Sequence, residues 1–323
     1  MSFAGAFVLA LAWPASEVRA LTVSPPTYWA SAHYQQNLLV GTVWQGSGEP
    51  ASWPVLNDAI ADAAMVLVGE THPNPDHHRL QAAVLQAVST AGKRPTVVWE
   101  MIPAARQTDL DEWAASGWLH PDRLGKTLAW DKSGWPPWAI YQPIASVAAT
   151  RQLRMIGTAL PRATMMSIGR KGEQGVSAEM RQKLHLDIQL AKSAQAELRT
   201  TLREGHCNLM PESALAPMAV AQRARDGAMA QAMLSGSKGG SSVLIAGNGH
   251  IRKDWGVAQL LAKLAPSVRT LSIAQIEVED GVLDPTSYFE KHATANGYDF
   301  VIFTPRAEIK DYCADLRKRF GKK

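Results

Sequence analysis

The sequence predicts an α/β protein in which a mainly parallel sheet is flanked by helices, with a small helical subdomain inserted before the last strands. Two observations carry this prediction: short apolar runs alternate with helical patterns, and several of these runs end on glycine-containing polar clusters. With 323 residues, of which 46% are hydrophobic, the chain is long enough to bury a sizeable core.

Four β-branched apolar runs have the character of buried parallel strands, because each is short and almost free of polar residues. They span residues 64–68, 96–99, 153–156 and 243–246, and a fifth candidate strand spans residues 298–303. The clusters that follow the first four runs are Gly69-Glu70-Thr71-His72, Glu100-Met101, Gly157 to Arg162, and Gly247-Asn248-Gly249-His250. Ligands of open α/β sheets bind outside the carboxyl ends of the strands, so we expect these clusters to converge.

Apolar side chains at spacings of three and four predict helices between the strands, over residues 76–88, 104–115, 143–149 and 257–264. One region departs from the alternation, because residues 177–203 and 212–234 have the pattern of two long helices separated by Gly205 and Pro211. Ser177 is the expected cap of the first. These two helices form the predicted insert, at about residues 177–235.

Composition and charge narrow the classes of function. The formal net charge is +4, but the tail from Arg317 to Lys323 supplies much of the basic excess. No basic stripe with interleaved aromatic residues occurs elsewhere, so nucleic-acid binding is not predicted. Cys207 and Cys313 form either a disulfide in an oxidising compartment or two buried thiols. We predict the disulfide, because both lie in expected loops beside polar residues.

The N-terminal segment has the features of a secretory signal. An apolar run from Phe3 to Trp13 ends before Pro14, and Val18-Arg19-Ala20 places small residues where a signal peptidase cuts, although a basic segment before the run is missing. We expect residues 1–20 to be a signal peptide and residues 21–323 to be a mature chain exported to the periplasm or cell envelope. No transmembrane helix is expected there, since no later run reaches about 18 apolar residues. The predicted cleavage site contains no cysteine, so a lipid anchor is not expected.

Glu70, His72, Glu100 and His250 are the candidate site residues, because all four lie at the ends of predicted strands. Two carboxylates and two imidazoles at one sheet edge have three uses: binding a divalent metal, acid/base chemistry on water, or surrounding a ligand that brings its own metal. Glu70 and His72 are two residues apart, so on an extended segment both point to the same side. Composition alone does not choose between these uses.

Aromatic residues are concentrated in one segment, which contains Trp130, Trp135, Trp138 and Tyr141. They form either a packed lid over the sheet or a stacking surface for a planar ligand. Tyr141 also offers a phenolic oxygen, one of the axial ligands that proteins use on haem iron. The adjacent imidazoles at 77–78 lie at the start of a predicted helix, where we expect them to be solvated or to cap it.

Several motifs, taken in order along the chain, resemble the ChaN family of haem-binding uptake proteins, which is grouped with the Tiki, TraB and erythromycin-esterase proteins. These motifs are G-E-T-H with the following H-H-R-L-Q, the E-M after the second strand, W-x4-W-x2-W-x2-Y, A-L-P-R, A-Q-R-A-R-D-G-A-M-A and G-N-G-H. They run from about Met65 to Phe303, which is most of the mature chain. Each motif is short, and their order is the specific feature.

The resemblance implies a parallel α/β core with a small helical subdomain, export to the cell envelope, and haem bound in a pocket or at the interface of a homodimer. It also implies a tyrosine as iron ligand, for which Tyr141 is the candidate, and haem-uptake receptor or transporter components as partners. The residues expected to contact haem, or another planar ligand, are Tyr141, Trp138, Glu70, His72, Glu100, Asn248 and His250. Arg162 and Arg252 are the expected partners of the propionates, since a guanidinium holds a carboxylate in bidentate geometry.

The alternative function is a metal-dependent or acid/base hydrolase. Here Glu70 or Glu100 activates a water molecule, while His72 and His250 bind a divalent metal or act as acid. Hydrolases of the wider superfamily have Glu and His residues at these motifs, which is again an implication of the resemblance. Serine nucleophile chemistry is not predicted, because the sequence contains no G-x-S-x-G elbow.

Overall fold

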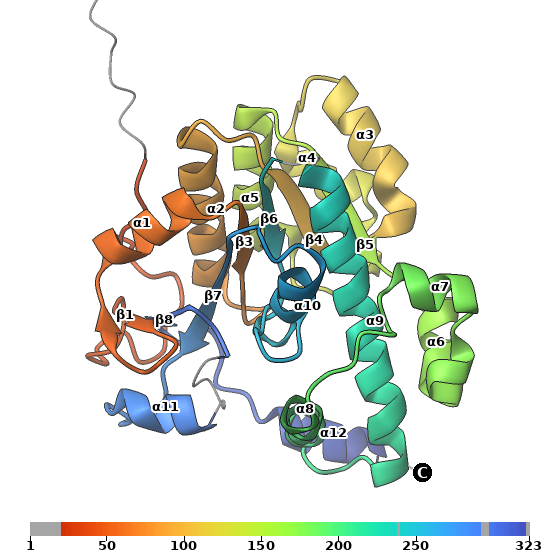
Figure 1. Ribbon diagram of the computed structural model, residues 1–323. Helices are drawn as coiled ribbons and strands as arrows, with labels where there is room; N and C mark the ends of the chain where they lie inside the picture. Colours follow the sequence, from red (N-terminus) through yellow and green to blue (C-terminus); the bar gives the residue numbers. More distant parts are fainter. Residues whose placement is uncertain (1–20, 238–239, 292–296, 321–323) are drawn as a thin grey trace, which may run out of the picture.

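The fold is shown in Figure 1 as a computed structural model, which describes residues 21–237, 240–291 and 297–320. The predicted signal peptide, residues 1–20, lies outside the described residues. Within them, one eight-stranded sheet has the order β2-β1-β8-β7-β3-β6-β4-β5. The strands are β1 (Val43–Gln45), β2 (Pro50–Ala51), β3 (Met65–Val68), β4 (Thr96–Pro103), β5 (Met155–Ala159), β6 (Ser242–Ile245), β7 (Thr270–Glu277) and β8 (Phe300–Thr304). The six from β3 to β8 are parallel, whereas β1 pairs antiparallel with β2 and β8.

Helices cover both faces of this sheet, as predicted (Figure 1). They are α1 (Trp53–Asp62), α2 (Pro75–Thr90), α3 (Gln107–Ala115), α4 (Pro121–Thr127), α5 (Trp138–Arg151), α6 (Arg162–Lys171), α7 (Ala178–Lys183), α8 (Lys192–Gly205), α9 (Glu212–Ser237), α10 (Val257–Leu264), α11 (Pro285–Lys291) and α12 (Tyr312–Phe320). Strand residues alternate between the two faces. Val66 and Val68 of β3 pack in the core beneath α1, α2 and α5, whereas Met65 and Leu67 pack in the core beneath α9 and α10.

The five predicted strands match β3, β4, β5, β6 and β8 within a few residues, whereas β1, β2 and β7 were not predicted. Strand β7 is the longest of these three. Its sequence is T-L-S-I-A-Q-I-E, in which two polar residues interrupt the apolar run. Both are fully buried and satisfied by distant backbone: Ser272 donates to the carbonyl of Ile251, and the Gln275 amide donates to the carbonyl of Gly69. The partners come from other parts of the chain, so the periodicity of β7 alone does not reveal a buried strand.

The helical insert differs from its prediction in two ways. Residues 177–203 are not one helix, because α7 ends at Lys183 and His185 has a left-handed φ of 52° before α8 begins. Ser177 does cap α7, by accepting from the amide of Met180. The second predicted helix, α9, is as long as expected, but its Met229 and Met233 pack against the sheet. This half of α9 is therefore part of the α/β core rather than of a separate subdomain.

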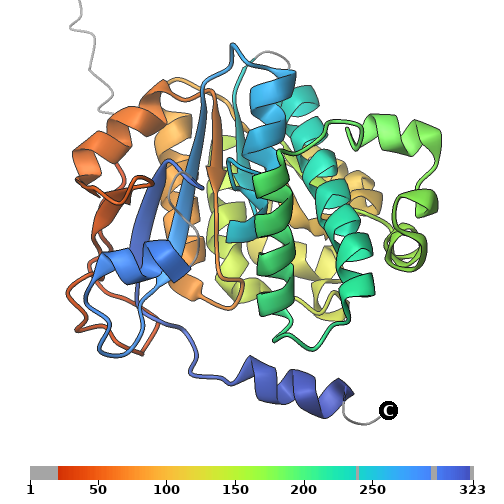
Figure 2. The same cartoon turned by 60° about the horizontal axis from the view of Figure 1, so that its bottom comes forward.

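A disulfide joins Cys207 and Cys313, whose Cα atoms are 5.6 Å apart, and confirms the predicted pairing. It links the turn between α8 and α9 to α12, which otherwise projects from the body of the molecule (Figure 2). The described part of α12 contains no buried residue. Among the described residues, no helix is long and apolar enough to cross a membrane.

Candidate functional site

Three neighbouring strands bring the four predicted site residues to one edge of the sheet. Glu70 and His72 follow β3, His250 lies in the short turn after β6, and Glu100 is in the last half of β4. Strand β6 lies between β3 and β4, so their carboxyl ends are adjacent. The structure thus gathers these four residues, here called the Glu/His cluster, as the strand-end prediction expects.

Glu70 is buried and holds two imidazoles. Its Oε1 lies 2.6 Å from Nδ1 of His72, and its Oε2 lies 2.7 Å from Nδ1 of His78 on α2. The other ring nitrogen of His78, Nε2, is 2.9 Å from the backbone carbonyl oxygen of His72. His78 therefore binds both the carboxylate and the backbone of the loop that carries His72, which fixes the position of that loop.

Glu100 holds the second half of the cluster. Its Oε2 accepts from the amide of Gly247 at 2.8 Å, and its Oε1 contacts the guanidinium of Arg225 and lies 3.3 Å from Nε2 of His250. On its other side, His250 has Nδ1 2.5 Å from Oδ1 of Asp226. Arg225 and Asp226 both come from α9, so this helix supplies one positive and one negative charge to the site.

Gly247 separates the two halves of the cluster. A Cβ atom at this position would lie 3.3 Å from Cε1 and Nε2 of His72 and 3.7 Å from Oε2 of Glu100. Because glycine has no side chain, the backbone passes between the His72 ring and the Glu100 carboxylate. The loop after β6 therefore contacts both halves.

The carboxylates and the imidazoles of the cluster stabilise each other's charged forms. Burial alone would raise the pKa of Glu70, but the charge of His78 and the hydrogen bonds from both imidazoles lower it to about 2. Burial would also raise the pKa of Glu100, but His250 and Arg225 hold it far below its usual range. Burial would lower the pKa of His250, yet Glu100 and Asp226 raise it to about 9. At neutral pH the site thus holds two carboxylates and a protonated His250.

His72 is the imidazole of the cluster that solvent reaches, since its side chain is 31% exposed. The indole of Trp135 lies against it, with ring centroids 4.6 Å apart and an interplanar angle of 59°. Trp135 is itself held by a hydrogen bond from its Nε1 to the carbonyl of Met101 at 3.2 Å. Among the described residues, Nε2 of His72 has no hydrogen-bond partner.

The other aromatic residues of this segment are packed inside the protein rather than presented to a ligand. Tyr141 is fully buried against His78 and Trp130, and its hydroxyl faces the carbonyl of His72 at 3.4 Å. Burial, with the nearby charge of Glu70, raises its pKa well above the usual value. Trp138 is also buried, stacked near Trp99. These positions do not support the expectation that Tyr141 supplies an iron ligand or that Trp138 lines the haem pocket.

The predicted propionate partners are placed differently from one another. Arg162 is exposed at the start of α6, after β5, and makes no contact with the Glu/His cluster. Arg252 is buried, paired with Asp254 at 2.6 Å and stacked on Trp255 at 3.9 Å. Arg252 is therefore held in place by Asp254 and Trp255, away from the Glu/His cluster.

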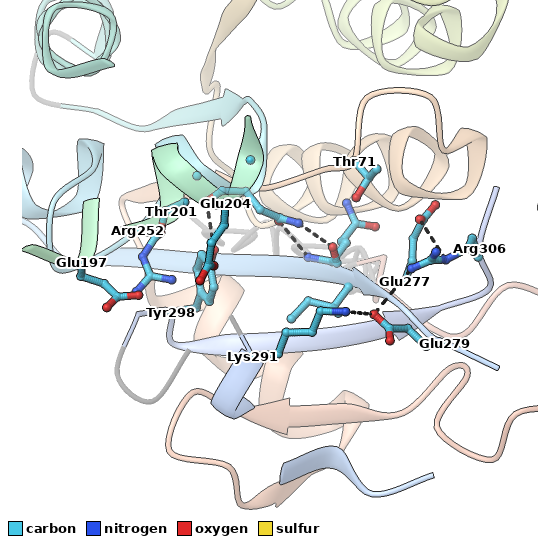
Figure 3. A pocket seen from close by; sticks show the side chains of 15 residues that line it. Thr71, Glu197, Thr201, Glu204, Arg252, Glu277, Glu279, Lys291, Tyr298 and Arg306 are labelled. Carbon is cyan, nitrogen blue, oxygen red and sulfur yellow. Dashed lines mark hydrogen bonds and ion pairs between the residues drawn. The ribbon is translucent and has the colours of Figure 1, made fainter. Parts of the chain in front are cut away.

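Asn248 joins the strand-end loops to each other. Its backbone amide donates to the carbonyl of Glu70 at 3.0 Å, and its side chain bonds both the amide and the carbonyl of Gln275 on β7. It also lines, with Arg252, a cavity of about 450 Å³ on the β7 side of these loops (Figure 3). No side chain of the Glu/His cluster lines this cavity. The loops after β3 and β6 therefore contribute to both the Glu/His cluster and this cavity.

Sequence reasoning missed the residues that support the cluster. His78 was expected to be solvated or to cap a helix, but the imidazoles at 77–78 are both fully buried. Arg225 and Asp226 belong to the A-Q-R-A-R-D-G-A-M-A motif, yet nothing in that motif shows that α9 passes over β4 and β6. Two adjacent opposite charges in the middle of this helix were the available signal, because such charges are buried only when they are paired.

No group of three His, Cys, Asp or Glu side chains in the described part of the chain is arranged to hold a metal ion. Instead, the carboxylates of the Glu/His cluster are each bound to two or more protein groups. The divalent metal expected under the hydrolase alternative therefore has no candidate site among these residues.

Comparison with known proteins identifies the family of this chain. A sequence profile described as haem-binding uptake, Tiki superfamily, ChaN matches residues 56–261. The chain belongs to the ChaN family. No curated protein matches it in sequence. One solved structure similar to this ChaN chain shows cofacial heme binding to ChaN of Campylobacter jejuni, with a TM-score of 0.62 and 19% identity, covering 80% of this chain and 95% of that one.

Two further solved structures resemble this ChaN family member more weakly. The type III effector HopBA1 has a TM-score of 0.42 and 13% identity, over 78% of this chain and 92% of that one. The erythromycin esterase EreC in its open conformation has a TM-score of 0.43 and 13% identity, over 81% of this chain and 95% of that one.

Proposed function

We propose that this ChaN family member binds haem at the exposed edge of His72 as the cargo of a haem-uptake process. One observation carries the proposal: Oε1 of Glu70 holds Nδ1 of His72 at 2.6 Å, while the Nε2 edge is left accessible. A histidine that ligates a metal typically donates its other ring N–H to a carboxylate in this way. Histidine is also a common axial ligand of haem iron.

The surroundings of His72 suit an apolar macrocycle that carries carboxylates. Beside the site, a recess of about 200 Å³ is lined by Met101, Ile102, Leu128 and Trp130. Two cationic side chains, Arg106 and Lys132, also line it. Arg106 already pairs with Asp109 at 3.1 Å, so Lys132 is better suited to pairing with a propionate. Trp135 connects His72 to this recess, because it contacts the His72 ring and the carbonyl of Met101, which lines the recess. The apolar and cationic side chains beside the accessible edge of His72 support haem as its ligand.

The other candidate ligands fit less well. His250 has one ring nitrogen against Asp226 and the other facing Glu100, and its raised pKa keeps it protonated at neutral pH. A protonated imidazole has no lone pair for a metal. Tyr141 would have to leave the core to reach a ligand in solvent. We therefore assign the iron to His72 in place of Tyr141.

A hemin titration followed by absorption tests this assignment. We expect saturable binding by the wild type and a shifted spectrum with at least tenfold weaker binding in His72→Ala. Tyr141→Phe should match the wild type, since its hydroxyl does not face the ligand. His33→Ala is the control for unspecific hemin binding to a partly exposed imidazole. A His72→Ala spectrum identical to that of the wild type would refute the assignment, and non-saturable binding by the wild type would refute the haem proposal itself.

The contact between Glu70 and His72 also favours a second candidate function, a hydrolase. An imidazole oriented by a carboxylate is also the arrangement of a general base that activates water. The base would then be His72, because both carboxylates have lowered pKa values and are already paired. Hydrolysis of an ester or peptide with a bell-shaped pH dependence, lost in Glu70→Gln and without saturable hemin binding, would favour this function.

We also propose that the chain acts after export to the periplasm, as a homodimer that receives haem from a receptor or transporter component. The signal-like segment 1–20 and the disulfide support export, because disulfides persist in oxidising compartments. The cofacial haem binding named for the Campylobacter jejuni protein supports a dimer in which two haems meet. Protein purified from a periplasmic fraction should begin at Leu21 and double its sedimenting mass on hemin addition. A retained Met1 would contradict the first part, and an unchanged mass the second.

A further inference from the structure

The cavity of about 450 Å³ on the other side of the strand-end loops has the make-up of a second binding site (Figure 3). Helix α8 forms one wall through Glu197, Thr201 and Glu204, and the end of β7 with the loops after β3 and β6 forms the other. This is the crevice outside the carboxyl ends of the strands, where open α/β sheets bind their ligands. Its volume falls within the usual range for small-molecule sites.

The charges that line the cavity leave a negative excess. Each of the three cations is already matched: Arg252 with Asp254, Lys291 with Glu279, and Arg306 with Glu277 and Glu279. In contrast, Glu197 and Glu204 have no cationic partner among the described residues. Both project from α8 toward the side of the cavity where Arg252 and Tyr298 lie (Figure 3). Anions are therefore disfavoured, and a cation would be attracted.

A buried acceptor points in the same direction. Gln275 lines the cavity, is fully buried, and has an Oε1 atom without a hydrogen-bond partner among the described residues. Its Nε2 donates to the carbonyls of Gly69 and His77, so the orientation of the amide is fixed. An unpaired buried oxygen destabilises the protein unless a donor reaches it. A ligand rich in N–H groups satisfies this requirement, whereas a carboxylate or phosphate does not.

We propose that this cavity binds a linear organic cation with two or more amino groups. Glu197 and Glu204 are seven residues apart on α8, which places them two turns and about 10 Å apart along the helix axis. Two ammonium groups joined by a flexible alkyl chain match that spacing better than one compact cation does. The ring of Tyr298 and the hydroxyl of Thr201 add a surface for the chain and one further acceptor. A bare metal ion is not favoured, because no three ligands meet within the described residues.

Calorimetric titration of the full-length protein with spermidine and with putrescine, in 0.15 M salt, tests the proposal. We expect saturable one-to-one binding of spermidine by the wild type and weaker binding of the shorter putrescine. The double variant Glu197→Gln/Glu204→Gln should weaken spermidine binding at least tenfold. Glu112→Gln/Glu179→Gln removes two exposed carboxylates on other helices and is the matched control for net charge. Its affinity should equal that of the wild type.

Three outcomes would overturn the proposal: no saturable heat with spermidine, equal weakening in both double variants, or saturable binding of citrate in place of spermidine. Thr201→Phe is a second probe that does not depend on charge, since it fills the cavity from α8 at an exposed position. Spermidine binding that survives this substitution would place the amine elsewhere. Hemin binding by the same variants reports separately on the proposal for His72.

Discussion

The buried carboxylates of Glu70 and Glu100 are tolerated because each one is bound by more than one partner. Glu70 and Glu100 are both about 3% exposed, and each carboxylate contacts two basic side chains. Removing one partner of a buried pair leaves an uncompensated charge and costs roughly 3 to 5 kcal/mol. The network therefore fixes the positions of the imidazoles, and within it only His72 keeps an accessible ring nitrogen.

Gly247→Ala tests how closely the backbone and the His72 ring depend on each other. The added Cβ would lie 3.3 Å from Nε2 of His72, so the ring must turn or shift by a few tenths of an ångström. We expect an altered hemin spectrum and weaker hemin binding, with little loss of global stability because the site lies at the edge of the core. Gly249→Ala is the control, since its Cβ would meet only Nε2 of Gln222 at 4.0 Å. Equal hemin spectra in both variants would show that His72 does not contact the iron.

The raised pKa of His250 predicts how stability changes with pH. Its pKa rises from about 6.5 to about 9 on folding, so its contribution is complete below pH 6.5 and is lost as the pH passes 9. A shift of this size corresponds to about 3 kcal/mol. His78 acts in the same direction, because its pKa is also raised.

Urea denaturation of the wild type and of His250→Gln between pH 6 and pH 10 isolates this contribution. The wild type should be the more stable protein at pH 6, and the difference in unfolding free energy should shrink as the pH rises. A difference that stays constant over this range would show that His250 does not change its charge there.

At the scale of the elements, the alternation of strands and helices predicted most of the sheet, because buried parallel strands are short apolar runs. Strand β7 was missed because its polar residues are satisfied by partners far away in the sequence. The turn after α7 was missed because it depends on the left-handed conformation of His185, and the sequence has no glycine there to indicate a turn. In the site, strand ends predicted the Glu/His cluster, but not the residues of α9, whose position over the sheet is a tertiary feature.

The disulfide between Cys207 and Cys313 is expected mainly to hold α12 against the rest of the protein. These cysteines are 106 residues apart, and loops of this length correspond to losses of about 2 to 5 kcal/mol when the bond is removed. Because α12 has no buried residue in its described part, it should detach in Cys207→Ser/Cys313→Ser and regain entropy in the folded state. We therefore expect a loss near the lower limit, about 2 kcal/mol, by urea denaturation. Hydrogen exchange should accelerate in α12 but not in the sheet, and protected amides in α12 of the variant would contradict this.

At the scale of the whole molecule, the two proposed sites share the same two loops. Thr71 lines the cavity and lies between Glu70 and His72, and Asn248 lines it directly after Gly247. The loops are also joined by the hydrogen bond from the Asn248 amide to the carbonyl of Glu70. A ligand that orders these loops from the cavity side would therefore also order the loop that positions His72. Binding at the two sites should be thermodynamically coupled.

Hemin affinity measured with and without saturating spermidine tests this coupling. We expect spermidine to tighten hemin binding by about fivefold or more, and hemin to tighten spermidine binding by the same factor, because linkage between two binding sites is reciprocal. Spermidine can also associate with free hemin, so Glu197→Gln/Glu204→Gln serves as the control: its hemin affinity should equal that of the wild type without spermidine and should not respond to spermidine. An equal response in this variant would assign the effect to free hemin. No response in the wild type, with both ligands bound, would mean that the shared loops are already rigid and the sites act independently.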